Sequence, residues 1–222
     1  MSITTNIQSI RAHIPTNVSL VCVSKFNPNE SIQEAYSSGE RIFGESKVQE
    51  LCGKYESLPK DIDWHFIGHL QTNKIKFIVP FVSLIHGVDS YKLLVEINKQ
   101  AQKVGVKVRC LFQVHIAQEE TKFGFSPTEL EETLTNGEWK SLENITICGL
   151  MGMATYTHNR EQIRAEFRSL KILFDQVKST YFPTNTNFRE LSMGMSDDYQ
   201  LAIEEGSTLV RVGSSIFGAR NY

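Results

Sequence analysis

The strongest constraint on the fold of this chain is the regular alternation of short apolar runs with helical stretches. Eight apolar runs, each of the length of a buried strand, are centred on Val21, Ile42, Phe66, Leu84, Leu111, Ile147, Leu191 and Val210. Helical stretches lie between them, such as "SIQEAYSSG", "SYKLLVEINKQAQKVG" and "NREQIRAEFRSLKILFDQVKS". Strands that alternate with helices predict right-handed crossovers and a parallel sheet.

Eight predicted strands favour an α/β fold of the closed (β/α)8 type, a TIM-type barrel, and the 222 residues suit that fold. Only "SSIFGARNY" follows the eighth strand, which is too short for a normal final helix. An extra N-terminal helix with Ile3, Ile7 and Ile10 on one face is therefore expected to cover the open place. We expect one domain over residues 1–222. A doubly wound open sheet is the alternative.

Charge and apolar pattern exclude several classes of function. The 23 Lys and Arg residues nearly balance the 25 Asp and Glu residues, so the net charge of −2 gives no electrostatic case for a nucleic-acid partner. No apolar run reaches membrane-spanning length, and the N-terminus lacks the pattern of a secretory signal. Cys22, Cys52, Cys110 and Cys148 are widely spaced, which is typical of reduced cysteines. We expect a cytoplasmic protein with no membrane partner.

A lysine follows the first apolar run at a position where a core residue is expected. In the stretch "SLVCVSKF", Lys25 lies two residues after Val23 and four after Val21. Because side chains alternate between the two faces of a strand, Lys25 should point the same way as these two valines. Arg211 lies in the eighth predicted strand, which neighbours the first in a closed barrel. A lysine beside an arginine and shielded from water should lose its proton more easily. From position alone, a solvated lysine or a pair with a carboxylate such as Glu45 is the simpler interpretation.

Small and hydroxylated residues follow the last two predicted strands, where barrels of this type often bind phosphate. The stretches "LSMGMSDD" and "LVRVGSSIFG" contribute Ser192, Ser196, Gly213 and Ser214, whose hydroxyl and backbone N–H groups can approach an anion. Ser196 is also suited to cap a helix that starts with the two aspartates. No nucleotide-binding GxGxxG or Walker motif occurs. A phosphate site near a neutral lysine amine is the arrangement that pyridoxal 5′-phosphate (PLP) requires.

Six longer motifs together indicate a family. In chain order they are "VCVSKFNP", "RIFGESKVQE", "WHFIGHLQTNK", "GLMGMA", "LSMGMSDD" and "STLVRVGSSIFGAR". This set resembles the YggS/PROSC family of PLP-binding proteins of vitamin B6 homeostasis, from about Leu20 to the C-terminus. The resemblance implies the barrel of the alanine racemase N-terminal domain. It also implies that PLP is the cofactor and is held as a Schiff base on Lys25.

The same resemblance implies a set of cofactor-binding residues. They are Lys25, Arg211, Gly213, Ser214, Ser192, Ser196, His65, Met151 and Ser46. Arg211 would lie against the pyridine nitrogen, and the serines and glycine after the last two strands would hold the phosphate. His65 and Met151 would line the ring pocket. Ser46 stands where the family usually has asparagine, so its polar contact is expected to be shortened or lost. Lys122, in "ETKFGF", is either a solvated loop residue or a second, transient attachment site.

The expected position of Arg211 argues against strong catalysis. A guanidinium cannot accept a proton in practice, so the ring nitrogen should stay unprotonated and the ring should be a weak electron sink. Racemases with this barrel also use a tyrosine from a second, β-rich domain, which we do not expect here because Tyr222 follows the eighth strand closely. We therefore predict a monomeric carrier that supplies PLP to apo-enzymes. The alternative is a PLP-dependent amino-acid racemase with weak activity.

Two further classes of site have little support in the sequence. A barrel enzyme acting on phosphosugars would need acid and base carboxylates at several strand ends, and Glu45 is the only clear one. His86 and His115 lie in strand-like stretches without the spacing of metal ligands, so no metal is predicted. His69 is given no role.

Overall fold

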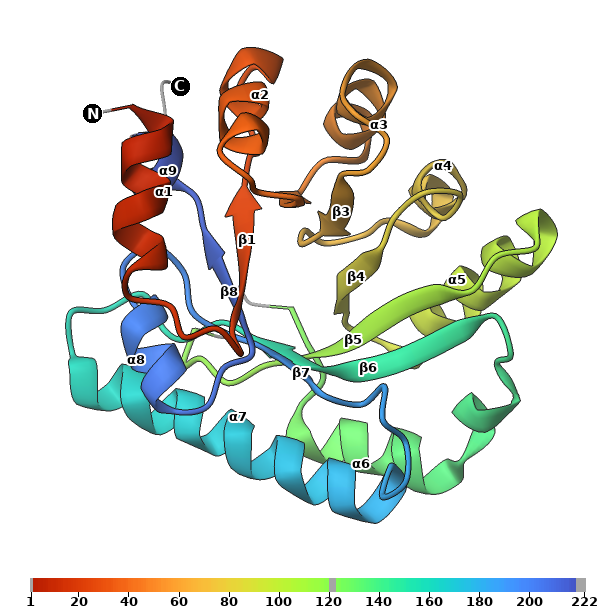
Figure 1. The fold of residues 1–222 in the computed structure, drawn as a ribbon. Coiled ribbons are helices and arrows are strands. Elements are labelled where there is room, and N and C mark those ends of the chain that lie inside the picture. Colours follow the sequence, from red (N-terminus) through yellow and green to blue (C-terminus); the bar gives the residue numbers. More distant parts are fainter. Residues whose placement is uncertain (1, 120–122, 219–222) are drawn as a thin grey trace.

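The computed structural model describes residues 2–119 and 123–218, and its strands form a closed parallel barrel (Figure 1). Neighbouring strands pair in chain order, and the last strand closes the ring against the first. The strands are β1 (Ser19–Val23), β2 (Ile42–Glu45), β3 (Asp63–Phe66), β4 (Leu84–Val88), β5 (Val108–Val114), β6 (Ile145–Gly152), β7 (Glu190–Ser192) and β8 (Leu209–Val212). All the predicted strand centres lie in these strands. The predicted barrel is confirmed, and the open sheet is wrong.

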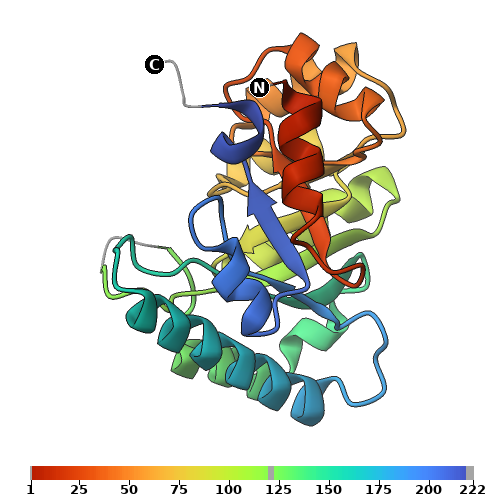
Figure 2. The ribbon, with the colours of Figure 1, turned by 60° about the vertical axis from the view of Figure 1, so that its left-hand side comes forward.

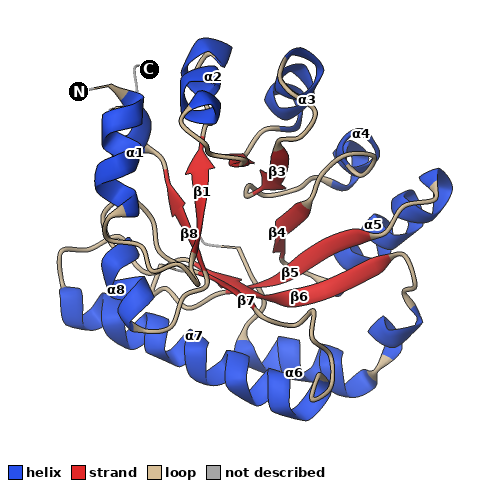
Figure 3. Ribbon diagram, in the orientation of Figure 1, coloured by secondary structure: helices blue, strands red, loops and turns tan. Residues whose placement is uncertain are grey.

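Helices surround the barrel on its outside (Figure 3). They are α1 (Ile3–Arg11), α2 (Asn29–Ser37), α3 (Val48–Ser57), α4 (Ile75–Ile78), α5 (Tyr91–Val104), α6 (Pro127–Asn136), α7 (Arg160–Tyr181), α8 (Tyr199–Glu204) and α9 (Ser214–Phe217), with 3-10 turns η1 (Thr72–Lys74) and η2 (Glu138–Ser141). The three quoted helical stretches correspond to α2, α5 and α7. Gly105 ends α5 with a φ of 69°, a backbone conformation that glycine adopts readily.

The N-terminal helix α1 lies beside the short α9, and the two views in Figures 1 and 2 agree on this. Asn6 of α1 donates a side-chain hydrogen bond to the carbonyl oxygen of Ile216 (2.8 Å). Ile7 and Ile10 are buried, and Ile3 is partly buried against the same core. The isoleucine face of α1 is therefore buried against the barrel beside the short α9, as the sequence predicts.

The apolar residues of the barrel form two separate cores. The larger core lies between the strands and the helices, and Leu20 and Cys22 of β1 belong to it. The smaller core fills the barrel interior and consists of Val21, Leu84, Leu111, Cys148, Met151 and Leu209. Successive residues of β1 thus face opposite sides of the barrel wall, because side chains alternate along a strand.

The closing pair of strands, β1 and β8, places the end of the chain beside its beginning. Val21 pairs with Arg211 and Cys22 with Val212 in a parallel register. Gly213 follows at the end of β8, where an added Cβ would lie 3.2 Å from both the Cβ and the carbonyl oxygen of Val23. The two strand ends are therefore packed closely at the C-terminal mouth of the barrel.

The longest described helix, α7, has 22 residues and packs with one face against β6 and α8. Its buried residues include Ile163, Phe167, Leu170 and Phe174, the apolar face that the sequence predicts. Within residues 2–119 and 123–218, no helix has the length and apolar character needed to cross a lipid bilayer. The four cysteines are all free thiols.

Candidate functional site

Lys25 lies two residues beyond the end of β1, in a turn at the mouth of the barrel. The Ser24 N–H still donates to the carbonyl oxygen of Gly44 (3.1 Å), and the Asn27 N–H donates back to Ser24 O (3.0 Å). The sequence predicts that the lysine ends the strand, but the strand ends at Val23 because the turn begins at the next residue. Lys25 is half-buried there.

A cluster of buried and half-buried charged side chains lies beside this turn. Lys54 of α3 donates to Ser24 O (2.9 Å), Glu45 Oε1 (2.8 Å) and Glu50 Oε1 (2.7 Å). Glu50 Oε1 also accepts the Phe26 N–H (2.6 Å), and Glu45 Oε1 accepts the Ser24 hydroxyl (2.6 Å). Burial raises the pKa of the Glu45 carboxyl, since desolvation outweighs the attraction of the ammonium. Glu45, Glu50 and Lys54 are called the Lys54 cluster below.

A second set of polar side chains crosses the barrel interior. Arg211 donates to the Ser192 hydroxyl (2.5 Å) and to the carbonyl oxygen of Gly152 (3.1 Å). Ser192 Oγ lies 2.9 Å from His86 Nδ1, and His86 Nε2 lies 3.0 Å from His65 Nδ1. All four side chains are buried. A continuous hydrogen-bonded chain therefore joins β8, β7, β4 and β3 inside the barrel.

Burial sets the protonation of this chain. It lowers the pKa of His65 to about 3, and it lowers the pKa of His86 well below its usual value, with the neighbouring His65 adding to the effect. Both imidazoles are therefore neutral near pH 7. Burial also lowers the pKa of Arg211 to about 10, which leaves the guanidinium charged at that pH. Within the described part of the chain no carboxylate forms an ion pair with Arg211, and Asp198 acts on it only through its charge.

The predicted phosphate residues lie at the ends of β7 and β8. The Gly213 N–H donates to Ser196 Oγ (3.1 Å), so these two residues are in contact. Ser214 follows Gly213 and is exposed at the start of α9. Ser192, in contrast, is fully buried, and its hydroxyl is shared between Arg211 and a histidine. The structure thus brings three of the four residues together at the mouth and places the fourth deeper in the barrel.

The predicted helix cap at Ser196 is wrong. Helix α8 begins at Tyr199, directly after Asp198. The Asp198 carboxylate turns back and accepts the Met195 N–H (2.5 Å), while the Tyr199 N–H donates to Met195 O (2.8 Å). Residues 195–198 form a turn before the helix, and this turn leaves the Ser196 hydroxyl for the Gly213 N–H.

The remaining predicted residues take different places around the barrel. Met151 belongs to the interior core and is paired with Ser192 in the register of β6 and β7. His65 is paired with Gly44 in the register of β3 and β2. Ser46 follows β2 and is half-buried. Lys122 lies outside the described residues.

Two residues of the site, His86 and Lys54, were not predicted from the sequence. His86 lies two residues after Leu84, which faces the barrel interior, so His86 faces the interior as well. A polar residue in the apolar run "SLIHGV" was therefore a usable signal of a site residue. Lys54 follows Val48 and Leu51 at helical spacing on the buried face of α3. A lysine on an apolar helix face was a similar signal, because a buried ammonium needs partners.

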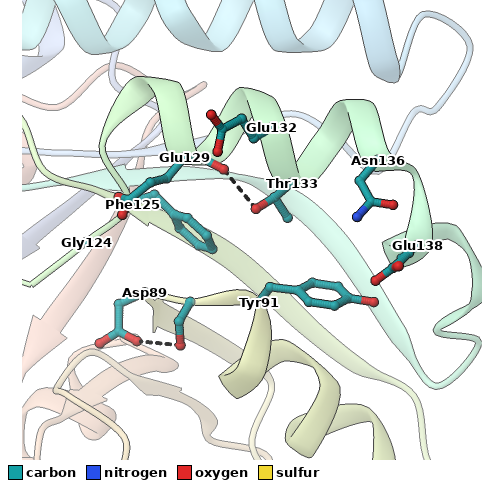
Figure 4. A pocket seen from close by; sticks show the side chains of 10 residues that line it. Asp89, Tyr91, Gly124, Phe125, Glu129, Glu132, Thr133, Asn136 and Glu138 are labelled. Atoms are coloured by element: carbon teal, nitrogen blue, oxygen red, sulfur yellow. Dashed lines mark hydrogen bonds between the residues drawn. The ribbon is translucent and has the colours of Figure 1, made fainter.

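A pocket of about 420 Å³ lies elsewhere, between the start of α5 and the length of α6 (Figure 4). Its lining includes Asp89, Tyr91, Phe125, Glu129, Glu132 and Glu138. None of the predicted cofactor residues lines this pocket. Its acidic lining would repel a phosphate, so the barrel mouth remains the candidate site.

Comparison with known proteins places these features in a family. The family model described as alanine racemase, N-terminal domain, matches residues 1–221. A pyridoxal phosphate homeostasis protein of Aquifex aeolicus is 43% identical over 205 residues, which cover 91% of this chain and 87% of that protein. A protein of the same name from Synechocystis is 36% identical over 213 residues, 95% of each chain.

Solved structures agree with the sequence relatives. PipY of Synechococcus elongatus without PLP has a TM-score of 0.92 at 34% identity, over 98% of this chain and 100% of that chain. The same protein with PLP bound has a TM-score of 0.88 at 33% identity over the same shares. An alanine racemase of Clostridium difficile, with a TM-score of 0.77 at 14% identity and 56% of its chain covered, is alike in fold. This chain therefore belongs to the family of pyridoxal phosphate homeostasis proteins, built on the barrel of the alanine racemase N-terminal domain.

Proposed function

We propose that this protein binds PLP through Lys25 and supplies it to apo-enzymes in intracellular vitamin B6 homeostasis. The observation that carries the proposal is Arg211, a buried cation with which no carboxylate forms an ion pair in the described part of the chain. Its partner in the register of β1 is Val21, on the strand that leads to Lys25. Because a buried charge without a directly paired counter-charge is unfavourable, an anionic or electron-rich ligand at this place would be stabilising.

The residues at the mouth fit the chemical groups of PLP. When bound, PLP supplies an aldehyde that an amine can attach to and a conjugated ring that withdraws electrons. Lys25 would hold it covalently. Ser196, Gly213 and Ser214 would hold the phosphate, because hydroxyl and backbone N–H donors form strong bonds to such an anion. Arg211 would donate to the ring nitrogen, while Met151, Ser46 and the imidazole of His65 would line the ring.

Ser192 has a different place in this proposal from the phosphate contact that the family resemblance implies. Its hydroxyl accepts from Arg211 and also bonds to His86. A hydroxyl has one donor and two acceptor positions, so two of its three are already occupied. We propose that Ser192 contributes to cofactor binding by holding the Arg211 guanidinium in place.

We propose a carrier rather than an efficient enzyme, and a monomer with one domain over residues 1–222. A guanidinium donates to the ring nitrogen without protonating it, which keeps the ring a weak electron sink. His65 and His86 are weak bases because burial lowers the pKa of both. The similar relatives from Aquifex aeolicus and Synechocystis are named for homeostasis. A weak amino-acid racemase is the second candidate, since the Clostridium difficile racemase has this fold.

The test is the absorbance spectrum of the purified protein mixed with PLP, before and after borohydride reduction. Attachment to a lysine predicts a visible band that reduction removes, with a pyridoxyl group left on the protein. The loaded, unreduced protein should then restore the activity of an apo-enzyme that needs PLP. A protein that shows no such band, or that reactivates nothing, would contradict the proposal.

A further inference from the structure

The turn that carries Lys25 has a conformation that its own sequence does not favour. The Asn27 N–H closes the turn on Ser24 O, which makes Phe26 its third residue. Phe26 has a φ of 66° and, among residues 2–119 and 123–218, is the only non-glycine residue with positive φ. Positive φ at this position of a turn favours glycine. Contacts from outside the turn must therefore hold it in place.

The Lys54 cluster supplies those contacts on both sides of Lys25. The Lys54 ammonium binds the carbonyl oxygen of Ser24, the residue before Lys25. The Glu50 carboxylate binds the N–H of Phe26, the residue after Lys25. Lys54 and Glu50 also bind each other, 2.7 Å apart and one helical turn apart on α3. The two side chains that hold the turn, Lys54 and Glu50, thus form an ion pair with each other on α3.

This cluster differs from an ordinary surface salt bridge. Lys54 is 6% exposed, and its three N–H donors have three acceptors. Glu45 is fully buried, and its Oε2 atom has no hydrogen-bond partner among the residues that the structure describes. Buried ion pairs are often no more stabilising than apolar residues of the same size, and an unsatisfied oxygen makes this one less favourable still. The cluster is therefore poorly explained by stability and better explained by the geometry it imposes.

We propose that the Lys54 cluster positions the Lys25 amine by fixing the backbone on both of its sides. The inference rests on the proposed attachment of PLP to Lys25. Glu50 and Lys54 act on the amine through the turn, so they are positioning residues. Their effect should be on the rate of attachment, because a misplacement of about 1 Å can slow a reaction about 100-fold.

The test separates binding of the cofactor from its capture by Lys25. Pyridoxine 5′-phosphate has an alcohol in place of the aldehyde, so its affinity reports binding alone. The growth of the visible band after mixing with PLP reports capture. Glu50→Ala removes the acceptor of the Phe26 N–H at a side chain that is 21% exposed, so the variant should fold. We expect capture to slow about tenfold or more, while the affinity for pyridoxine 5′-phosphate changes less than about twofold.

Three further variants sharpen the result. Glu50→Gln keeps an oxygen acceptor for the Phe26 N–H and should recover part of the capture rate. Glu56→Ala, an exposed change on the same helix, is the matched control and should capture PLP at the normal rate. Lys54→Met removes the donor to the carbonyl oxygen of Ser24 and should slow capture as well. Its folding is not required for the test, since Glu50→Ala is sufficient.

Two results would overturn the positioning role. One is equal capture by the unaltered protein and Glu50→Ala, and the other is a proportional loss of binding and capture in that variant. A failure of the proposed function looks different. It would be an unaltered protein that reduction does not label at Lys25.

Discussion

Arg211 donates a hydrogen bond to the hydroxyl of Ser192 at a place where both side chains are buried. The same hydroxyl lies 2.9 Å from His86 Nδ1, so removing it leaves two buried polar groups each short of a partner. We expect Ser192→Ala to lower the free energy of unfolding by about 1–3 kcal/mol, measured by urea denaturation. Ser179→Ala, an exposed serine on α7, is the control and should change it little. Equal stability of both variants would contradict the buried role.

Attachment of PLP should depend on one lysine. Borohydride reduction of the loaded protein should leave a pyridoxyl group on the peptide that contains Lys25, identified by mass spectrometry. Lys25→Ala should lose the visible band and keep its fold, because the residue lies in a turn beyond β1 and outside both cores. A label found mainly on Lys122 would assign the attachment elsewhere.

The phosphate should supply much of the affinity. Pyridoxal, which lacks the phosphate, is expected to bind much more weakly than PLP, because the charge-assisted bonds at the mouth are then missing. Ser214→Asp should weaken retention of PLP by like-charge repulsion, as measured by dialysis. Ser179→Asp adds the same charge at an exposed position of α7 and should retain PLP normally. Equal affinities for pyridoxal and PLP would remove the phosphate site.

The buried His65 should make stability depend on pH. Its pKa is about 3 in the folded protein and about 6.5 in the unfolded chain, so below pH 6.5 the unfolded state takes up the proton first. The contribution of the neutral ring is complete above about pH 6.5 and is lost as the pH falls toward 3. We expect His65 to add a slope of about 1.4 kcal/mol per pH unit to the free energy of unfolding in this range.

This slope can be measured by urea denaturation between about pH 4 and pH 7. His65→Gln should flatten the slope by the contribution of one histidine. The control is His158→Gln, the same substitution at an exposed position. The same slope in His65→Gln and the unaltered protein would show that His65 is not held neutral by burial.

Carrier and racemase should differ in their treatment of alanine. Racemisation needs a base on each face of the α-carbon, each within reach of the proton that it moves. Lys25 could serve one face, but burial makes His65 and His86 weak bases for the other. In deuterated water we expect at most slow α-deuteration of L-alanine and no appreciable D-alanine by chiral chromatography. Rapid inversion that Lys25→Ala abolishes would support the racemase.

The sequence was sufficient for the fold because the fold depends on periodic patterns. The apolar runs located every strand. The spacing of Ile7 and Ile10 likewise predicted the buried face of α1. Such patterns are local, and each can be read within one element.

The site was less accessible because it depends on contacts between elements. The Lys54 cluster joins α3 to the turn after β1, and no spacing in the sequence predicts that contact. The position of Ser192 beneath the phosphate residues likewise follows from its bonds to Arg211 and His86. The cap predicted at Ser196 was wrong because a competing turn begins at the preceding residue.

The pairing of β1 with β8 has a consequence for the time at which a newly made molecule can take up its ligand. During synthesis Lys25 leaves the ribosome early, whereas Arg211 emerges only after the other strands of the barrel. The two come together when the register of Val21 with Arg211 forms, which is the step that closes the barrel. If Lys25 and Arg211 hold the ligand as proposed, a nascent chain would expose the amine of Lys25 before the rest of its pocket exists, and tight uptake would have to wait until translation of the eighth strand is complete.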